Sequence, residues 1–459
     1  MATTDADITP SPKSPPRLAT GETTGLVRIQ VDGLLGRYSY RIPASETIPA
    51  SDSQLVILYG DNGSGKTTLL KLIFHLLSPS DERGHIGELL SANFSRLRLE
   101  LADATVLEAR RASSDSAQPT HLDITITRNG QTLASVRYGM PKPADSTPTE
   151  ERVSLRHQVA SAMASIGLDV YFLTDNRRLL SDVLAVEEDP SSVLYWQTAT
   201  TGTSARRRPA QPGKEVSDAM GRASEWIFKA AVGQSGQGDR STNSIYEEVI
   251  AQIASAKPGR PSITVSREDL TQRLGVVARQ TNDFAEFGLM APFSADRLVR
   301  AVQSMPAGRL AMVRRILLPY IEGLDARISA LRPIRELINT FVSTINSFFV
   351  DKALRYSLGA GFQVVTLGTS RPGVLDPDGL SSGERQLLLL FCNVLPARDH
   401  KSLFIIDEPE LSLNVKWQRQ LVSSLLRCTE GSDIQFLLAT HSIELLTQHE
   451  RNVQRLVAP

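Results

Sequence analysis

A glycine-rich loop contains the residues of this chain that are best suited to chemistry. Residues 60–67 read GDNGSGKT and match G-x-x-x-x-G-K-[ST], the pattern of a phosphate-binding loop. In such a loop backbone N–H groups wrap the phosphates, the lysine bridges the β- and γ-phosphates, and the last hydroxyl binds Mg²⁺. The sequence therefore predicts a bound nucleoside triphosphate with Mg²⁺. The residues expected to bind it are Gly60, Asn62, Gly63, Gly65, Lys66, Thr67 and Thr68.

The segments around this loop favour the nucleotide over a plain glycine-rich turn. An apolar run, Leu55–Tyr59, comes directly before the loop and is predicted to be a short buried strand. Residues 68–77 follow the loop and are predicted to form an apolar helix. A phosphate-binding loop needs this context, because the N-terminus of the helix points its partial positive charge at the anion.

Two carboxylates follow a second apolar run far downstream. Residues 403–406 are predicted to form a buried strand, and Asp407 and Glu408 come at its end. In nucleotide-hydrolysing proteins with a phosphate-binding loop, an acid at this place holds Mg²⁺. We assign that role to Asp407, and we expect Glu408 to polarise the attacking water as a general base. A strand that ends in two solvated acids is the simpler alternative.

Two more motifs lie in the last third of the chain. Residues 380–386 (LSSGERQ) precede an apolar helix predicted at 387–395, so Ser381 and Gly383 lie at a helix N-terminus that can bind an anion. His441 follows a predicted strand at 434–438, where an imidazole can contact a γ-phosphate. Alone, the first motif is an ordinary helix cap and the second a structural histidine.

The order of these motifs resembles that of the ATP-binding cassette (ABC-type) ATPases. The resemblance implies that the chain hydrolyses ATP slowly and only as a homodimer or higher even-numbered oligomer. Each site then combines two chains, with Ser381 and Gly383 of one closing over ATP bound by the other. Asn414 and the turn around it are implied to link the two sites. The implied catalytic residues are Glu408, His441 and Lys66, and the implied Mg²⁺ ligands are Thr67 and Asp407.

A narrower resemblance concerns residues 408–418 (EPELSLNVKWQ) and the Ala-Thr-His-Ser run at 439–442. They look most similar to the overcoming-lysogenization-defect branch and to ATPase subunits of anti-phage systems such as PARIS and Septu. Asn414 stands where family members often have histidine, and Ser382 where they have glycine. The equivalent of the Mg²⁺-sensing glutamine is not identified; residues 175–177 (DNR), after an apolar strand, are the candidate.

The overall composition of the chain gives no sign of a charged partner or of a membrane span. Lys+Arg and Asp+Glu both total 50, so the net charge is zero and does not indicate a nucleic acid or an anionic membrane as partner. The two cysteines, Cys392 and Cys428, lie in apolar runs and are predicted to be buried thiols. No run is long enough to span a membrane, and we expect a cytoplasmic protein.

The chain is predicted to be an α/β protein with an ABC-type ATPase head, an antiparallel β arm and an inserted helical subdomain. Residues 1–24 are expected to be a disordered tail, 25–175 the first part of the head and 351–459 its second part. Residues 176–350 are the helical insertion, with a flexible segment near 189–240. Pro319 and Pro333 interrupt an apolar stripe at 309–350, which predicts short antiparallel helices rather than one long helix.

These features lead to two functional hypotheses. In the first, the chain is the sensor or scaffold ATPase of a bacterial anti-phage defence system, which responds to a phage-encoded trigger and controls a separate effector. Only 18 residues follow His441, so we expect the effector, a nuclease, to be another protein. In the second, the chain is a DNA-maintenance ATPase similar to RecF and SMC proteins, and arginines at 309–335 contact nucleic acid. A transporter subunit is disfavoured by the long insertion.

Overall fold

A computed structural model describes residues 25–43, 54–78, 84–112, 121–139, 150–176, 178–182, 212–255, 266–368 and 373–456. The described residues divide into two compact units. The head consists of those within Leu18–Val216 and Leu380–Pro459, and the helical unit of those within Ser217–Gly379. The tail expected at 1–24 and the segment 189–211 lie outside the described residues.

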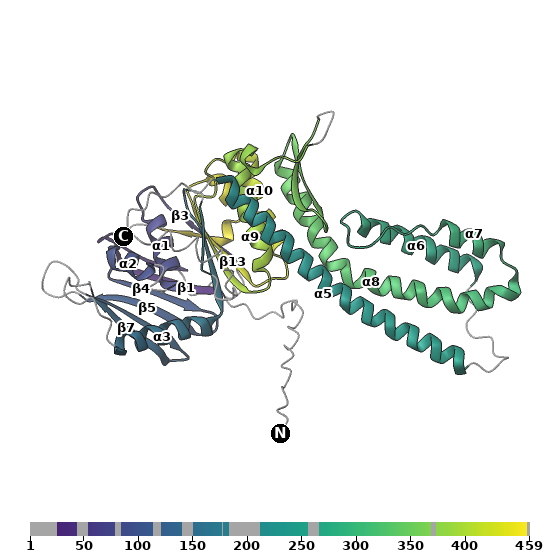
Figure 1. The fold of residues 1–459 in the computed structure, drawn as a ribbon. Helices are drawn as coiled ribbons and strands as arrows, with labels where there is room; N and C mark the ends of the chain where they lie inside the picture. Colours follow the sequence, from purple (N-terminus) through teal and green to yellow (C-terminus); the bar gives the residue numbers. More distant parts are fainter. Residues whose placement is uncertain are drawn as a thin grey trace, which may run out of the picture. The chain divides into compact units, whose positions relative to one another are not determined.

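The first sheet of the head is an antiparallel arm of six strands in the order β2-β1-β4-β5-β6-β7 (Figure 1). Alternating side chains of these strands are buried, as expected for a sheet with one covered face. The expected antiparallel arm is present. The strands are β1 (Leu26–Leu34), β2 (Tyr38–Ile42), β4 (Arg96–Leu101), β5 (Thr105–Ala112), β6 (His121–Arg128) and β7 (Gln131–Gly139).

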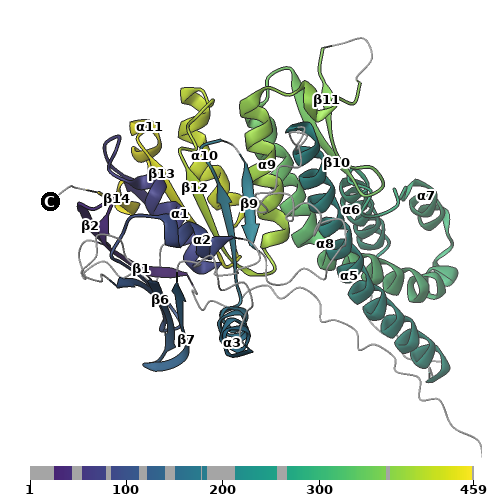
Figure 2. The same cartoon turned by 60° about the vertical axis from the view of Figure 1, so that its left-hand side comes forward.

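The second sheet of the head is mostly parallel, with the order β14-β3-β13-β12-β8-β9. All neighbouring pairs are parallel except β8 and β9, which are antiparallel. Strands β12 and β13, which lie inside this sheet, are buried along almost their whole length, as is typical of parallel strands covered on both faces (Figure 2). The strands are β3 (Leu55–Tyr59), β8 (Leu168–Leu173), β9 (Leu179–Asp182), β12 (Lys401–Asp407), β13 (Ile434–Thr440) and β14 (Val453–Arg455).

Helix α1 (Lys66–Leu77) contacts strands of both sheets and forms the centre of the head's core. It packs on β8, β12 and β13 on one side and on β5 on the other. Gln435 also joins the sheets, because its side-chain amide exchanges two hydrogen bonds with the backbone of Leu26. The remaining head helices are α2 (His85–Ser91), α3 (Glu150–Ile166), α9 (Ser382–Ala397), α10 (Val415–Cys428) and α11 (Ile443–Leu446), with the short η3 (Glu450–Asn452).

The helical unit contains most of α5 (Pro212–Ser255), together with α6 (Arg267–Ala285), α7 (Asp296–Ser304) and α8 (Ala307–Phe348) (Figure 2). Residues 212–240 belong to α5. For these residues, the prediction of a flexible segment near 189–240 is therefore wrong. The segment is rich in polar residues, but its apolar residues recur with helical spacing and form one buried face. Its buried members are Val216, Ala219, Met220, Ala223, Ile227, Ala230 and Ala231.

The prediction of several short helices at 309–350 is wrong, because α8 runs without a break through Pro319 and Pro333. A proline inside a helix costs about 3 kcal/mol. Each buried large apolar side chain contributes about 1.5–3 kcal/mol, so burial along α8 outweighs the two prolines. The buried residues are Leu310, Leu317, Ile321, Ile328, Leu331, Ile334, Ile338, Phe341, Ile345 and Phe348.

Strands β10 (Lys352–Ser357) and β11 (Gly361–Thr366) form a hairpin that lies in the helical unit rather than in the head. Phe341 of α8 packs on Phe362, and Asn346 exchanges hydrogen bonds with Leu354, so the hairpin is fastened to α8. The short η2 (Pro377–Gly379) follows it. The structure therefore divides the chain near 217 and 379, whereas the sequence predicted 176 and 350. In the part of the chain that is described, no helix is both long and apolar enough to cross a membrane.

Candidate functional site

The glycine-rich loop at 60–67 connects β3 directly to α1. Gly63 and Gly65 have φ angles of 83° and 84°, in the left-handed region that favours glycine. A Cβ on Gly65 would lie 2.9 Å from Cδ2 of Leu34, so the loop also packs too tightly there for a larger residue. Helix α1 starts at Lys66, and the N–H groups in the first turn of a helix have no partner within the helix.

Lys66 is buried, and its ammonium lies within the loop. Its Nζ donates hydrogen bonds to the carbonyl oxygens of Gly60, at 2.7 Å, and Asp61, at 3.1 Å. The hydroxyl of Tyr40 on β2 donates to the carbonyl of Ser64, at 2.9 Å, which ties the antiparallel arm to the loop. The loop and its lysine are therefore held in place by both sheets.

The parallel sheet brings the other candidate residues to the same edge. Strands β3, β13 and β12 are neighbours, and the residues that follow their carboxyl ends are the loop, His441 and Glu408. Ligands of open α/β sheets bind at this edge, because the loops that leave parallel strands converge there. Segments separated by more than 300 residues thus form one site.

Asp407, the last residue of β12, is 1% exposed. Its carboxylate has no well-formed hydrogen bond among the described residues, and Thr67 is the nearby side chain that can donate to it. Burial, reinforced by the nearby carboxylates of Glu408 and Asp175, raises the pKa of Asp407 to about 6, although Thr67 and Lys71 act in the opposite direction. A buried carboxylate without donors is costly unless a cation compensates it. The donor set of Asp407 and the Thr67 hydroxyl consists of hard oxygens and fits Mg²⁺.

Glu408 leaves the strand with a φ of 49°, a left-handed backbone that is rare outside glycine. Its amide still donates to the carbonyl of Ala439 on β13, at 2.8 Å. Its Oε1 lies 3.4 Å from Nδ1 of His441, and this imidazole is 45% exposed. Glu408 and His441 are therefore in contact and accessible at the edge of the sheet, where a carboxylate can accept a proton from water.

Ser381 and Gly383 begin α9 as the sequence placed them. The Ser381 hydroxyl accepts from the amide of Glu384, at 3.3 Å, and the Glu384 carboxylate accepts from the amide of Ser381, at 2.7 Å, which is a complete capping box. A Cβ on Gly383 would lie 2.7 Å from the carbonyl oxygen of Ser412. Glycine is therefore required here by the chain's own packing, apart from any ligand.

The turn after Glu408 is closed by hydrogen bonds. Asn414 is the N-cap of α10, and its side chain accepts from the amide of Trp417, at 2.9 Å. Within the turn, the amide of Leu413 donates to the carbonyl of Glu410. Asn414 therefore provides a good cap for α10.

Sequence reasoning missed Glu410, which it read only as the start of this turn. Its side chain is 6% exposed and lies 3.5 Å from Nδ1 of His441. Glu410 lies within the run 408–418, but the resemblance based on that run gives it no part in the reaction. The candidate Asp175 follows β8, the neighbour of β12, and is close enough to raise the pKa of Asp407, whereas Arg177 lies outside the described residues.

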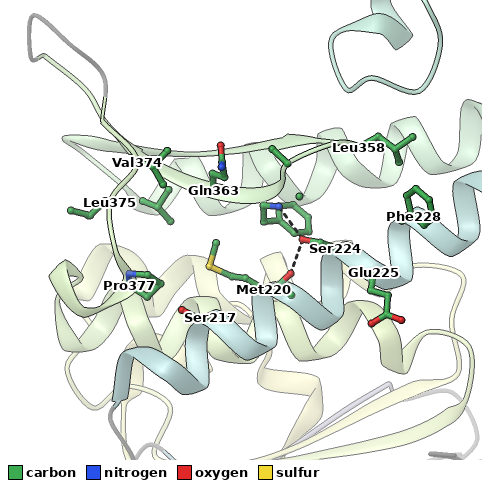
Figure 3. A pocket seen from close by; sticks show the side chains of 15 residues that line it. Ser217, Met220, Ser224, Glu225, Phe228, Leu358, Gln363, Val374, Leu375 and Pro377 are labelled. Carbon is green, nitrogen blue, oxygen red and sulfur yellow. Dashed lines mark hydrogen bonds between the residues drawn. The ribbon is translucent and has the colours of Figure 1, made fainter. Parts of the chain in front are cut away.

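A hollow of about 550 Å³ opens in the helical unit (Figure 3). Helix α5 forms one wall, and β11 with the segment after it forms the other. Ser224 joins the walls, because its hydroxyl donates to the carbonyl of Met220 and accepts from the amide of Phe362. Phe228 and Val374 line the hollow and remain exposed. None of the sequence-predicted site residues lines it.

Two family models match separate parts of the chain. The model described as "ABC transporter" matches residues 47–181, which include the glycine-rich loop. The model described as "AAA domain, putative AbiEii toxin, Type IV TA system" matches residues 238–447, which include Ser381, Asp407 and His441. The two matches thus cover both halves of the candidate site.

Similar solved structures are heads of Smc proteins. One is the Smc head with an extended coiled coil bound to the C-terminal domain of ScpA from Pyrococcus furiosus, with 12% identity over 92% of this chain and 91% of that chain and a TM-score of 0.33. Another is the Smc head with a coiled coil and joint from Pyrococcus yayanosii, with 11% identity over 92% and 93% and a TM-score of 0.33. A comparison with curated proteins gave no match.

Proposed function

We propose, starting from the ABC-type P-loop ATPase fold of this chain, that it binds and hydrolyses ATP with Mg²⁺ at the edge of the parallel sheet. One observation carries the proposal. The topology brings the loop of Lys66, the unpaired buried carboxylate of Asp407 and the Glu408–His441 pair together at the carboxyl ends of adjacent strands. This set contains a phosphate cradle, a cation ligand and a general base, which together are the requirements of phosphoryl transfer to water.

The residues of the chain have distinct parts in this reaction. Backbone N–H groups of the loop and Lys66 hold the β- and γ-phosphates, and Thr67 and Asp407 hold the cation. Bound Mg²⁺ neutralises charge that develops on the phosphate oxygens. Glu408 accepts the proton of the attacking water, and His441, 3.4 Å from it, contacts the γ-phosphate side. The water oxygen forms a bond to the γ-phosphorus while the bond from that phosphorus to the β,γ-bridging oxygen breaks, and ADP and phosphate are released.

We propose that the site is completed by a second copy of the chain. Ser381 and Gly383 start a 16-residue helix whose first turn offers backbone N–H groups and a hydroxyl to an anion. In the proposed dimer these groups close over ATP held by the partner. Hydrolysis is then slow and depends on dimerisation, because neither chain alone has a complete site.

For the biological role, we propose the sensor or scaffold subunit of an anti-phage defence system with a separate effector protein, a nuclease, and a phage-encoded trigger. The proposed control of a second protein draws support from the match to the model described as "AAA domain, putative AbiEii toxin, Type IV TA system". The hollow between α5 and β11, with exposed Phe228 and Val374, supports docking of a protein, because apolar side chains anchor most interfaces.

Phosphate release and native mass spectrometry on one preparation test this function. We expect ATP hydrolysis per chain to rise with protein concentration, since the site needs two copies. Purified with the products of neighbouring genes, the protein should form an even-numbered oligomer that carries a second protein. Hydrolysis independent of concentration would contradict the composite site, and an oligomer that carries DNA without a second protein would contradict the defence role.

A second candidate function, binding of nucleic acid, is favoured by the distribution of arginines. Between residues 297 and 321 the sequence has five arginines and no acid, and it has no lysine between 258 and 351. Arginine is the side chain of choice for phosphate contacts. Arg309 and Arg315 lie on the exposed side of α8 and form no salt bridge with any described residue. Arg335, in the other half of α8, lies 4.0 Å from Asp283 and is balanced.

Binding of a labelled 20-base-pair DNA duplex, measured by fluorescence anisotropy at several salt concentrations, checks this candidate. If the first half of α8 contacts phosphates, Arg309→Gln with Arg315→Gln should weaken binding and lower the salt slope by about 2, roughly one unit for each lost contact. Arg335→Gln is the matched control and should change neither quantity. Equal binding by all three proteins would remove nucleic acid as the partner of α8.

A further inference from the structure

A second carboxylate, that of Glu410, lies behind Glu408 and His441 without a part in the proposed reaction. Its Oε1 accepts three hydrogen bonds, from Oγ1 of Thr440 at 2.6 Å, from the amide of His441 at 3.0 Å and from the amide of Ser442 at 3.2 Å. Its Oε2 has no partner among the described residues. One buried oxygen atom thus accepts hydrogen bonds from the last residue of β13 and from both residues that follow it.

These three bonds converge on a single acceptor atom. They also fix an imidazole that has to be placed accurately. Nδ1 of His441 lies 3.4 Å from Oε1 of Glu408 and 3.5 Å from Oε1 of Glu410, so the ring is held between two carboxylates. The backbone of His441 and its ring therefore depend on the same oxygen atom of Glu410.

The same residue connects this segment to the turn that leads to α10. Nε2 of Gln418 donates to the carbonyl of Leu413 at 2.9 Å, and Oε1 of Gln418 accepts from the hydroxyl of Ser442 at 2.8 Å. The amide of Leu413 donates to the carbonyl of Glu410. Backbone and side-chain bonds of Glu410 and Gln418 thus make the turn and the residues after β13 one rigid piece.

We propose that Glu410 is a positioning residue, which fixes His441 and through it the orientation of Glu408; this inference rests on the proposed ATPase function. Glu410 does not itself accept a proton from the attacking water, because its Oε1 is filled by three donors and its Oε2 is buried away from solvent. Its action requires an acceptor oxygen at the place of Oε1 and not a negative charge. Misplacement of a reacting group by about 1 Å costs roughly 10²-fold in rate, so the effect is large.

Glu410→Ala and Glu410→Gln separate this action from general acid–base chemistry. Glu410→Ala removes the acceptor, and we expect kcat to fall by roughly 10²-fold while KM for ATP changes by less than about threefold. Glu410→Gln keeps an acceptor oxygen at the place of Oε1, and its side-chain NH2 group takes the place of Oε2, which makes no hydrogen bond. Its kcat should therefore stay within about threefold of wild type. Glu444→Gln, a change of an exposed acid paired with Arg419, is the matched control.

Hydrogen exchange of the His441 and Ser442 amides gives a readout that does not need hydrolysis. Both amides donate to Glu410, so they should exchange at least about tenfold faster in Glu410→Ala and at the wild-type rate in Glu410→Gln. Unchanged exchange in Glu410→Ala overturns the proposal, and so does an equal loss of kcat in both variants. If the wild type hydrolyses no ATP, the proposed function fails, whereas the exchange rates still decide the role of Glu410.

A third variant covers the case in which Glu410→Ala does not fold. Thr440→Val removes the shortest of the three donors and preserves the shape of a fully buried side chain. We expect a several-fold loss of kcat with KM retained. The Ser442 amide should exchange faster, because it also donates a hydrogen bond to the Thr440 hydroxyl, at 2.9 Å. Wild-type values for both quantities would overturn the proposed network.

Discussion

Glu408→Gln is expected to stop steady-state ATP hydrolysis while ATP stays bound and the protein accumulates as a dimer. Glutamine has the shape of glutamate and can still contact His441, but it cannot accept a proton from water. General base catalysis contributes about 10²–10⁴-fold, so hydrolysis should fall by at least about 10²-fold. The chain would then retain its substrate, and the closed dimer would no longer be reopened by product formation.

The measurement combines phosphate release with light scattering in the presence of Mg²⁺ and ATP. Glu444→Gln is the control, because it makes the same chemical change at an exposed acid. It should hydrolyse ATP like the wild type and dimerise no more strongly. A Glu408→Gln protein that remains monomeric and free of ATP would contradict the composite site and with it the proposed use of Ser381 and Gly383.

Asp407→Asn is expected to make the protein more stable and inactive at the same time. Burial raises the pKa of Asp407 from 3.8 to about 6. The ionised side chain therefore destabilises the fold, by about 3 kcal/mol at most, since each pKa unit is worth about 1.4 kcal/mol. A raised carboxylate pKa means that this cost is absent below about pH 3.8 and complete above about pH 6. Asparagine removes the cost together with the cation ligand.

Urea unfolding at pH 5 and pH 8 checks the stability, and phosphate release checks the activity. The free energy of unfolding of Asp407→Asn should exceed that of the wild type by more at pH 8 than at pH 5. Mg²⁺ with ATP should raise the melting temperature of the wild type by a larger amount than that of the variant. An advantage of the variant that is equal at both pH values would show that the charge of Asp407 is already compensated in the fold.

Local sequence signals predicted the fold class and most of the candidate site. Strands β3 and β12 are marked in the sequence by apolar runs. The loop between β3 and α1 is marked by glycines, whose positive φ angles other residues rarely adopt. The parallel head, the antiparallel arm and the inserted helices were predicted on this basis, and the fold class is confirmed. These are features in which local pattern and tertiary structure agree.

The errors arise where tertiary packing outweighs a local rule. Pro319 and Pro333 indicate breaks, yet burial along α8 exceeds their cost. Small residues such as Ala219 and Ala223 give α5 a buried face that composition alone describes as polar. Strand β5 has no continuous apolar run, because charged residues, among them Glu108 paired with Arg96, alternate with its buried positions. Glu410 acts through contacts with residues 30 positions away, which no local pattern contains.

The capping box of α9 uses only part of the hydrogen-bonding capacity of the Ser381 hydroxyl. In the box the Ser381 oxygen uses a lone pair to accept from the amide of Glu384, and its own hydrogen atom is not used by that bond. Holding a helix and binding a phosphate oxygen thus require opposite polarities of the same hydroxyl. In the proposed dimer, Ser381 can therefore bind a neighbour's nucleotide and still cap α9, because the two bonds use different atoms of the hydroxyl.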